Sequence, residues 1–134
     1  MDYNLSGNLQ KGYFYACPRC NNLVYSLAPL TIQCCEQPLQ ALVPQPAAEE
    51  HAFHIERVEG EFFVSLSHEM TKSHSIQFLA YVRPHRMDLV KLYPEGPAES
   101  RFAYGGRGML YAYCQVHGLQ EMPLIPQKIT KALP

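Results

Sequence analysis

Residues 53–66, FHIERVEGEFFVSL, decide the fold class of this 134-residue chain. Two runs of strand character, Phe53–Val58 and Glu61–Leu66, flank Glu59-Gly60, a pair that suits a tight hairpin turn. Further runs of the same character follow downstream, at Ser75–Val82, Met87–Tyr93, Ser100–Tyr104 and Met109–Val116. Because turn-forming residues separate most of these runs, the pattern predicts an antiparallel β-sandwich of the immunoglobulin-like type.

The composition of the chain agrees with an all-β protein of modest size. Eleven prolines and eight glycines are spread along the sequence, and nowhere do apolar residues keep a 3.6-residue spacing for long enough to predict a helix. Hydrophobic residues make up 47% of the chain and charged residues 17%, which is enough apolar material for a packed core. The length fits one ordinary domain, or a small domain with an appendage, and excludes a large multidomain machine.

The charge balance and the apolar runs exclude several classes of partner. Eleven basic against twelve acidic residues give a formal charge of −1, so there is no electrostatic reason to expect binding to nucleic acid or to an anionic membrane. The longest apolar run, Met109–Cys114, is far shorter than the roughly 20 residues of a membrane-spanning helix. The start, MDYNLSGNLQ, lacks the features of a secretory signal, so we expect a cytoplasmic protein with reduced thiols.

The distribution of cysteine and histidine predicts two domains. Residues 13–39 hold four of the five cysteines and residues 51–117 hold all six histidines. Between them lies LVPQPAAEE, in which Pro44 and Pro46 favour an extended connector. We therefore place the domains at 1–43 and 44–134. A segment of about 40 residues rarely folds on a hydrophobic core alone, which favours a bound metal in the first domain. The tail 124–134 carries no recognisable chemistry.

The first domain contains a pattern typical of a metal knuckle. Cys17-Pro18-Arg19-Cys20 can bring two thiolates onto one ion, and Asn21 then tolerates the positive φ that the chain needs. After thirteen intervening residues, Cys34 and Cys35 complete a set of four sulfur donors that suits iron or zinc. The alternatives are four unrelated thiols, a redox-active cysteine pair, or a purely structural zinc ribbon.

The second domain offers a mixed set of possible ligands. His68 and His74 are joined by a short loop, and Cys114 and His117 are separated by two residues and followed by Gly118, which can adopt positive φ. His51 could supply one more imidazole. Each histidine taken singly is more often a surface or core residue than a ligand. We read His54 and His85 in that way and do not predict them to bind metal.

These spacings together resemble desulfoferrodoxin, the two-domain form of superoxide reductase. The resemblance rests on C-x2-C-x13-C-C, E-x-H, H-x-M-x3-H-x-I and C-x2-H-G, and it extends from the first knuckle to Gly118. It implies a desulforedoxin-like first domain with Fe(Cys)4, and an immunoglobulin-like sandwich that holds a non-haem iron. The ligands that it implies for the second iron are four equatorial histidines and one axial cysteine, here His51, His68, His74, His117 and Cys114.

The resemblance also implies an activity. Superoxide would be reduced by one electron to hydrogen peroxide, without release of oxygen, and the oxidised iron would be reduced again by an outside donor such as rubredoxin. Glu49 would serve as the carboxylate that caps the ferric iron. A homodimer is plausible, because the small first domain buries little surface alone and relatives in the family pair.

Three positions depart from the family pattern. Glu50 replaces the lysine that attracts superoxide, Glu69 replaces a proline, and Gln115 replaces an asparagine. Lys72, in the loop that joins His68 to His74, is a candidate to supply the missing positive charge, and the alternative is a solvated loop lysine. The sequence thus leaves two functions open beside a structural zinc protein: an active superoxide reductase, or an electron-transfer or metal-binding protein that has lost useful turnover.

Overall fold

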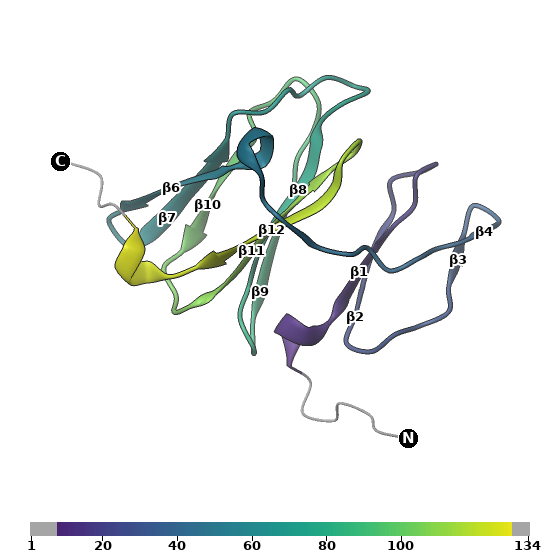
Figure 1. The fold of residues 1–134 in the computed structure, drawn as a ribbon, viewed down its shortest axis with the longest axis horizontal. Helices are drawn as coiled ribbons and strands as arrows, with labels where there is room; N and C mark the ends of the chain where they lie inside the picture. Colours follow the sequence, from purple (N-terminus) through teal and green to yellow (C-terminus); the bar gives the residue numbers. More distant parts are fainter. Residues whose placement is uncertain (1–7, 130–134) are drawn as a thin grey trace.

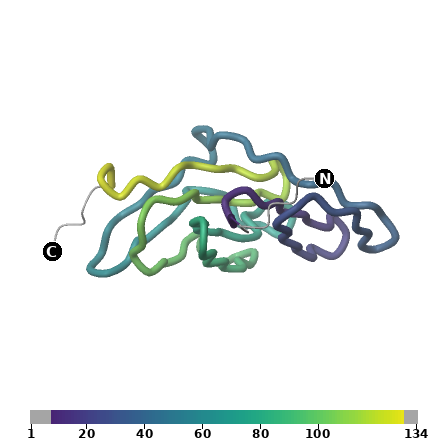
Figure 2. The backbone as a smooth tube through the Cα atoms, turned by 90° about the horizontal axis from the view of Figure 1, so that it is seen from below, coloured from purple at the N-terminus to yellow at the C-terminus, as the bar shows by residue number. Residues whose placement is uncertain are grey.

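The computed structural model describes residues 8–129, and it is all-β (Figure 1). Two sheets form a sandwich, and two small hairpins lie at one end of the molecule (Figure 2). The three-stranded sheet has the order β10-β7-β6, and the five-stranded sheet has the order β5-β12-β11-β8-β9. The strands of the sandwich are β5 (Gln45–Pro46), β6 (Phe53–Val58), β7 (Glu61–Leu66), β8 (Ile76–Val82), β9 (Met87–Lys91), β10 (Glu99–Ala103), β11 (Gly108–Cys114) and β12 (Gly118–Leu124).

The first segment consists of two hairpins. Strands β1 (Tyr13–Ala16) and β2 (Leu23–Ser26) form one, and β3 (Gln33–Cys34) and β4 (Gln37–Pro38) form the other. Three short 3-10 helices complete the regular structure of residues 8–129, namely η1 (Leu9–Lys11), η2 (Glu49–His51) and η3 (Pro126–Lys128). None of these helices has the length and apolar character needed to span a bilayer.

The hairpin predicted at residues 53–66 is present with the predicted bounds. Strands β6 and β7 pair antiparallel, and Glu59 has a φ of 54° in the turn between them. The other four predicted strands also form, with ends that differ by one or two residues. Sequence analysis did not predict β12, because Gln120, Glu121 and Pro123 interrupt its apolar pattern. Antiparallel pairing with β11 over its whole length forms this strand nevertheless.

The sandwich core lies between the two sheets. Strand β7 alternates half-buried and buried residues, and Phe62 and Val64 are fully buried against the five-stranded sheet. Strand β8 differs, because all seven of its residues are buried. A strand that is buried on both faces needs a continuous apolar sequence, and IQFLAYV is nearly that.

The first segment covers the outer face of the five-stranded sheet. Phe14 of β1 is buried there, with its ring centroid 5.2 Å from those of Phe78 on β8 and Tyr111 on β11. Ala80 and Leu119 belong to the same cluster. The two segments therefore share a hydrophobic core, and β5, just after the predicted boundary between residues 43 and 44, pairs with β12. The domain limits 1–43 and 44–134 stay a prediction, and residues 1–7 and 130–134 lie outside the described part of the chain.

This shared core predicts the effect of one substitution. Phe14→Ala should lower the free energy of unfolding of the metal-loaded protein by about 3 kcal/mol, because it leaves a cavity against Phe78 and Tyr111. Denaturant titration would measure the change, and Leu30→Ala, at a side chain that is 45% exposed, is the control. A loss no larger than that of the control would show that the contact contributes little to stability.

Candidate metal centres

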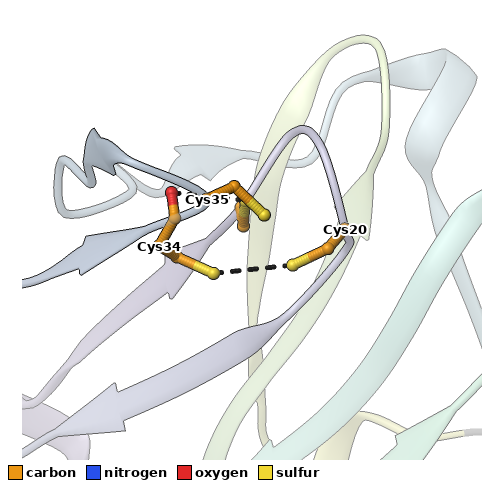
Figure 3. A group of neighbouring side chains, drawn as sticks. Cys20, Cys34 and Cys35 are labelled. Carbon is orange, nitrogen blue, oxygen red and sulfur yellow. Dashed lines mark hydrogen bonds between the residues drawn. The ribbon is translucent and has the colours of Figure 1, made fainter.

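The four cysteines of the first segment form one compact group. Cys17 follows β1, Cys20 closes the knuckle, and Cys34 and Cys35 lie at the β3–β4 hairpin. All four Sγ atoms lie within 4.8 Å of one another, and those of Cys20 and Cys34 are 3.5 Å apart (Figure 3). All are free thiols. Four sulfur donors at this separation suit a tetrahedral site for iron or zinc.

The backbone presents these sulfurs through two turns of left-handed conformation. Asn21 has the predicted positive φ, at 62°, and its N–H donates to the carbonyl of Cys17 over 2.9 Å. In the β3–β4 hairpin the two turn residues, Cys35 and Glu36, have φ values of 52° and 63°. A left-handed conformation costs a residue with a side chain roughly 1–2 kcal/mol. Sequence analysis missed this second strained turn, which bonds from a metal to Cys34 and Cys35 would stabilise.

The thiols differ in their tendency to ionise. The backbone N–H of Cys20 donates toward Cys17 and lowers the pKa of that thiol to about 7, against the opposing effect of burial. Hydrogen bonding with Cys20 raises the pKa of Cys34, and raises that of Cys35 to about 12. Four neighbouring sulfurs thus cannot all ionise together near neutral pH. A bound cation removes this repulsion, so metal binding at this group should release protons.

Four histidines of the sandwich form a closed square. Their ring centroids are separated by 4.7–5.1 Å along its four sides, in the order His51, His68, His74, His117. The Sγ atom of Cys114 lies 3.5 Å from Nε2 of His68 and 3.4 Å from Nδ1 of His117. The Cys114 sulfur also lies within 4.8 Å of a ring nitrogen of both His51 and His117, and of both His68 and His74. The structure therefore brings together all five residues that the resemblance implies for this site.

Separate segments deliver these side chains. His51 ends η2, His68 and His74 lie in the β7–β8 loop, Cys114 ends β11, and His117 lies in the turn before β12. That turn uses Gly118 at a φ of 88°, as predicted, and the N–H of His117 donates to the Cys114 sulfur over 3.3 Å. The hydrogen bond ties the Cys114 sulfur to the turn that carries His117.

A β-bulge sets the direction of Cys114. Tyr113 pairs with Phe78, whereas Cys114 pairs with Ile76, so Gln77 is an extra residue on β8. Bulges re-aim the side chains beside them and occur often next to functional sites. The Cys114 side chain is fully buried, while His117 is exposed. The cluster is thus closed at Cys114 and at the buried His51, and it is accessible from solvent at His117.

Several atoms of the histidine square fit a metal ion and have no other explanation. Nε2 of His51 and Nε2 of His74 are buried without a hydrogen-bond partner. Nδ1 of His68 lies 2.6 Å from the carbonyl oxygen of Glu69, so this nitrogen carries the proton and Nε2 is left free as a donor to metal. Burial lowers the pKa of both His51 and His68, which favours the neutral, metal-binding form of each ring. These observations fit an ion held by four imidazoles and one thiolate.

The remaining residues singled out from the sequence are not part of this cluster. Glu49 begins η2 and Lys72 lies in the β7–β8 loop; both are exposed, and their assigned roles stay predictions. His54 and His85 are exposed and lie outside the ligand groups found among residues 8–129. Sequence analysis missed a contact of Glu69. Its carboxylate oxygen lies 3.7 Å from Nδ1 of His74 and accepts a hydrogen bond from Thr71 over 2.8 Å.

An all-β fold with a four-sulfur group and a four-histidine, one-cysteine group defines a class of protein with two candidate non-haem metal sites. No family model matches the chain. It is 30% identical over 94 residues to desulfoferrodoxin of Clostridium acetobutylicum, a match that covers 66% of this chain and 75% of that protein. The chain belongs to the desulfoferrodoxin family.

A solved structure shares the fold. The superoxide reductase of Treponema pallidum superposes with a TM-score of 0.72 at 20% identity, over 84% of this chain and 98% of that one. A one-iron superoxide reductase of Giardia intestinalis is a weaker match, with a TM-score of 0.49 at 15% identity, over 58% of this chain and 99% of that one. The first of these matches confirms the predicted fold class.

The two ligand groups predict separable losses of metal. Cys34→Ser should remove about one metal ion per chain and loosen the β3–β4 hairpin, while the sandwich keeps its ion, because no ligand is shared. Cys114→Ser should remove the ion of the sandwich and leave the ion of the first segment in place. Metal analysis of both purified variants, each the control for the other, would check this. Loss of both ions from Cys34→Ser would show that the two groups do not bind independently.

Proposed function

We propose that this chain is a superoxide reductase, which reduces superoxide by one electron to hydrogen peroxide. The observation that carries the proposal is the closed square of His51, His68, His74 and His117 with the Cys114 sulfur against it. These five residues would hold a non-haem iron, and Cys17, Cys20, Cys34 and Cys35 would hold a second ion, iron or zinc. When bound at the square, iron supplies one electron, and with two protons from solvent superoxide becomes hydrogen peroxide.

The protein's own residues prepare this chemistry in three ways. These five residues would leave one position of a six-coordinate ion free, which would let a small oxygen species reach it directly. The buried Cys114 closes one side and leaves approach from the side of the exposed His117. The neutral imidazoles and single thiolate leave a ferrous site with a net charge of +1, which attracts an anion.

Charged residues near the histidine square decide how fast superoxide arrives. Glu49 and Glu50 precede His51, and all three lie in η2, so two carboxylates repel an approaching anion. We assign Glu49 to capping the ion in its oxidised state. We assign Lys72, in the loop between two histidines of the square, to attracting superoxide in place of the lysine that Glu50 replaces.

The proposal extends to the surroundings of the protein. Continued turnover needs an outside one-electron donor, for which a protein such as rubredoxin is suited. We expect the chain to work in the cytoplasm, where its five free thiols stay reduced, and to form a homodimer.

A second function has one observation in its favour. Glu50 adds a carboxylate where the family has a lysine, and an electron-transfer or metal-binding protein without useful turnover would tolerate this change. Pulse radiolysis, which generates superoxide in a solution of the reduced, iron-loaded protein, distinguishes the two functions. A superoxide reductase oxidises with a second-order rate that Cys114→Ser abolishes, whereas a non-catalytic protein reacts no faster than that variant.

The role of Lys72 predicts a change in rate without a change in metal content. Lys72→Ala should slow the second-order reaction with superoxide by roughly 2- to 10-fold and flatten its dependence on ionic strength, because one steering charge is lost. Lys128→Ala, at an exposed lysine in η3, is the matched control. An unchanged rate for Lys72→Ala, together with a large gain for Glu50→Lys, would contradict the assignment.

A further inference from the structure

A row of hydrogen-bonded polar side chains, partly buried, runs beside the histidine square and is not explained by metal ligation. Ser75, just before β8, is fully buried, and Gln77 is 7% exposed on that strand, whose other residues include no charged side chain. Gln77 is the extra residue of the β-bulge that aims Cys114. A polar side chain in a core must form hydrogen bonds to offset the cost of its burial, so the partners of Gln77 indicate its purpose.

The side-chain oxygen of Gln77 accepts a hydrogen bond, and its amide nitrogen donates two. The Lys91 ammonium, which can only donate, lies 3.4 Å from Oε1 of Gln77 and 2.7 Å from the carbonyl of Leu92. The amide nitrogen of Gln77 is thereby turned toward the site, where it donates to Oγ of Ser75 over 2.9 Å and to Oε1 of Gln115 over 3.4 Å. The orientation of one amide therefore sets the orientation of the next.

Gln115 extends this row of hydrogen bonds to the loop that holds two of the histidines. Its Oε1 accepts from Ser75 as well as from Gln77, so its amide nitrogen faces away and donates to the carbonyl of Lys72 over 3.3 Å. Its backbone N–H also donates to the carbonyl of Ser75 over 3.0 Å. Gln115 follows Cys114 directly, and Lys72 lies between His68 and His74. One side chain thus joins the cysteine strand to the histidine loop.

The first half of this loop is anchored at Met70, whose carbonyl accepts from the N–H of Glu95 over 2.6 Å and whose side chain packs against the sandwich core. Residues 71–74 have fewer contacts. Within residues 71–74 the described backbone hydrogen bonds close a local turn, from Thr71 to His74 and from His74 to Thr71, at 3.0 and 3.3 Å. Such a turn fixes the shape of the loop but not its position over the sandwich. Thr71, Lys72 and Ser73 are exposed, so packing on these residues does not position the loop.

We propose that Gln115 and Gln77 are positioning residues, which hold the β7–β8 loop against β11 so that His68 and His74 face the Cys114 sulfur before any ion binds. The proposal rests on the function proposed above only in taking these three residues as ligands. Holding the ligands in place lowers the entropy lost when the ion enters and slows its release.

Hydrogen exchange on the metal-free protein tests this directly. Gln115→Ala should raise amide exchange in residues 68–75 and leave the β6–β7 hairpin and the cysteine hairpins unchanged. The variant should fold, because Gln115 is exposed. Gln77→Leu removes the amide at nearly constant volume and should loosen the same residues. Gln127→Ala, at an exposed glutamine of η3, is the matched control.

Metal retention supplies the second measurement. In native mass spectrometry after a chelator challenge, Gln115→Ala should lose one of its two ions roughly 10-fold faster than the parent. The double variant of Gln77→Leu with Gln115→Ala should lose this ion little faster than Gln115→Ala alone, because both side chains act through the same row of hydrogen bonds. Loop exchange and ion release equal to those of Gln127→Ala, or fully additive effects in the double variant, would overturn the proposal. Neither measurement involves superoxide, so inactivity toward superoxide would leave the result standing.

Discussion

The double-sided burial of β8 is the constraint on which the rest of the structure depends. One face of this strand packs against the three-stranded sheet through residues such as Tyr81, and the other packs against Phe14 of the first segment. Its neighbours β9 and β11 take up its backbone hydrogen bonds along both edges. Because every side chain of β8 is buried, the sandwich and the cysteine-containing hairpins cannot be separated without exposing apolar surface.

The first segment has a small core of its own and depends on additional contacts for its stability. Its own buried cluster consists of Tyr15, Cys17 and Leu39, with partly buried residues around them. That is little core for two hairpins, one of which has two consecutive left-handed residues at its turn. Docking through Phe14 on one side and four sulfur donors on the other supply what a larger core would otherwise provide.

The histidine and cysteine site combines rigid and adjustable parts. Cys114 comes from a central strand whose bulge aims the sulfur, whereas His68 and His74 come from a loop with mostly exposed residues. Glu69 lies within 3.7 Å of His74 and adds a carboxylate beside a ring that would donate to the ion. The departure from the family's proline at this position therefore places an acidic side chain against a predicted ligand.

Local sequence patterns were sufficient for features that depend on neighbouring residues. The hairpin at residues 53–66 followed from two strand-forming runs around Glu59-Gly60, and the positive φ of Asn21 and of Gly118 followed from the turn that each knuckle requires. The nine predicted ligands follow motifs of short spacing, and the structure gathers all of them into two groups. Turn chemistry and alternation are short-range effects, so they can be read along the chain.

Contacts between distant segments were decided by the tertiary structure alone. Strand β12 has a weak pattern of its own and forms because β11 offers a full edge for pairing. The docking of Phe14 on Phe78 and Tyr111 needs the five-stranded sheet to exist first. The hydrogen bond from Gln115 to the carbonyl of Lys72 joins residues 43 positions apart, across a bulge that no periodicity reveals. Such contacts depend on how whole elements are arranged in space, which propensity and spacing do not encode.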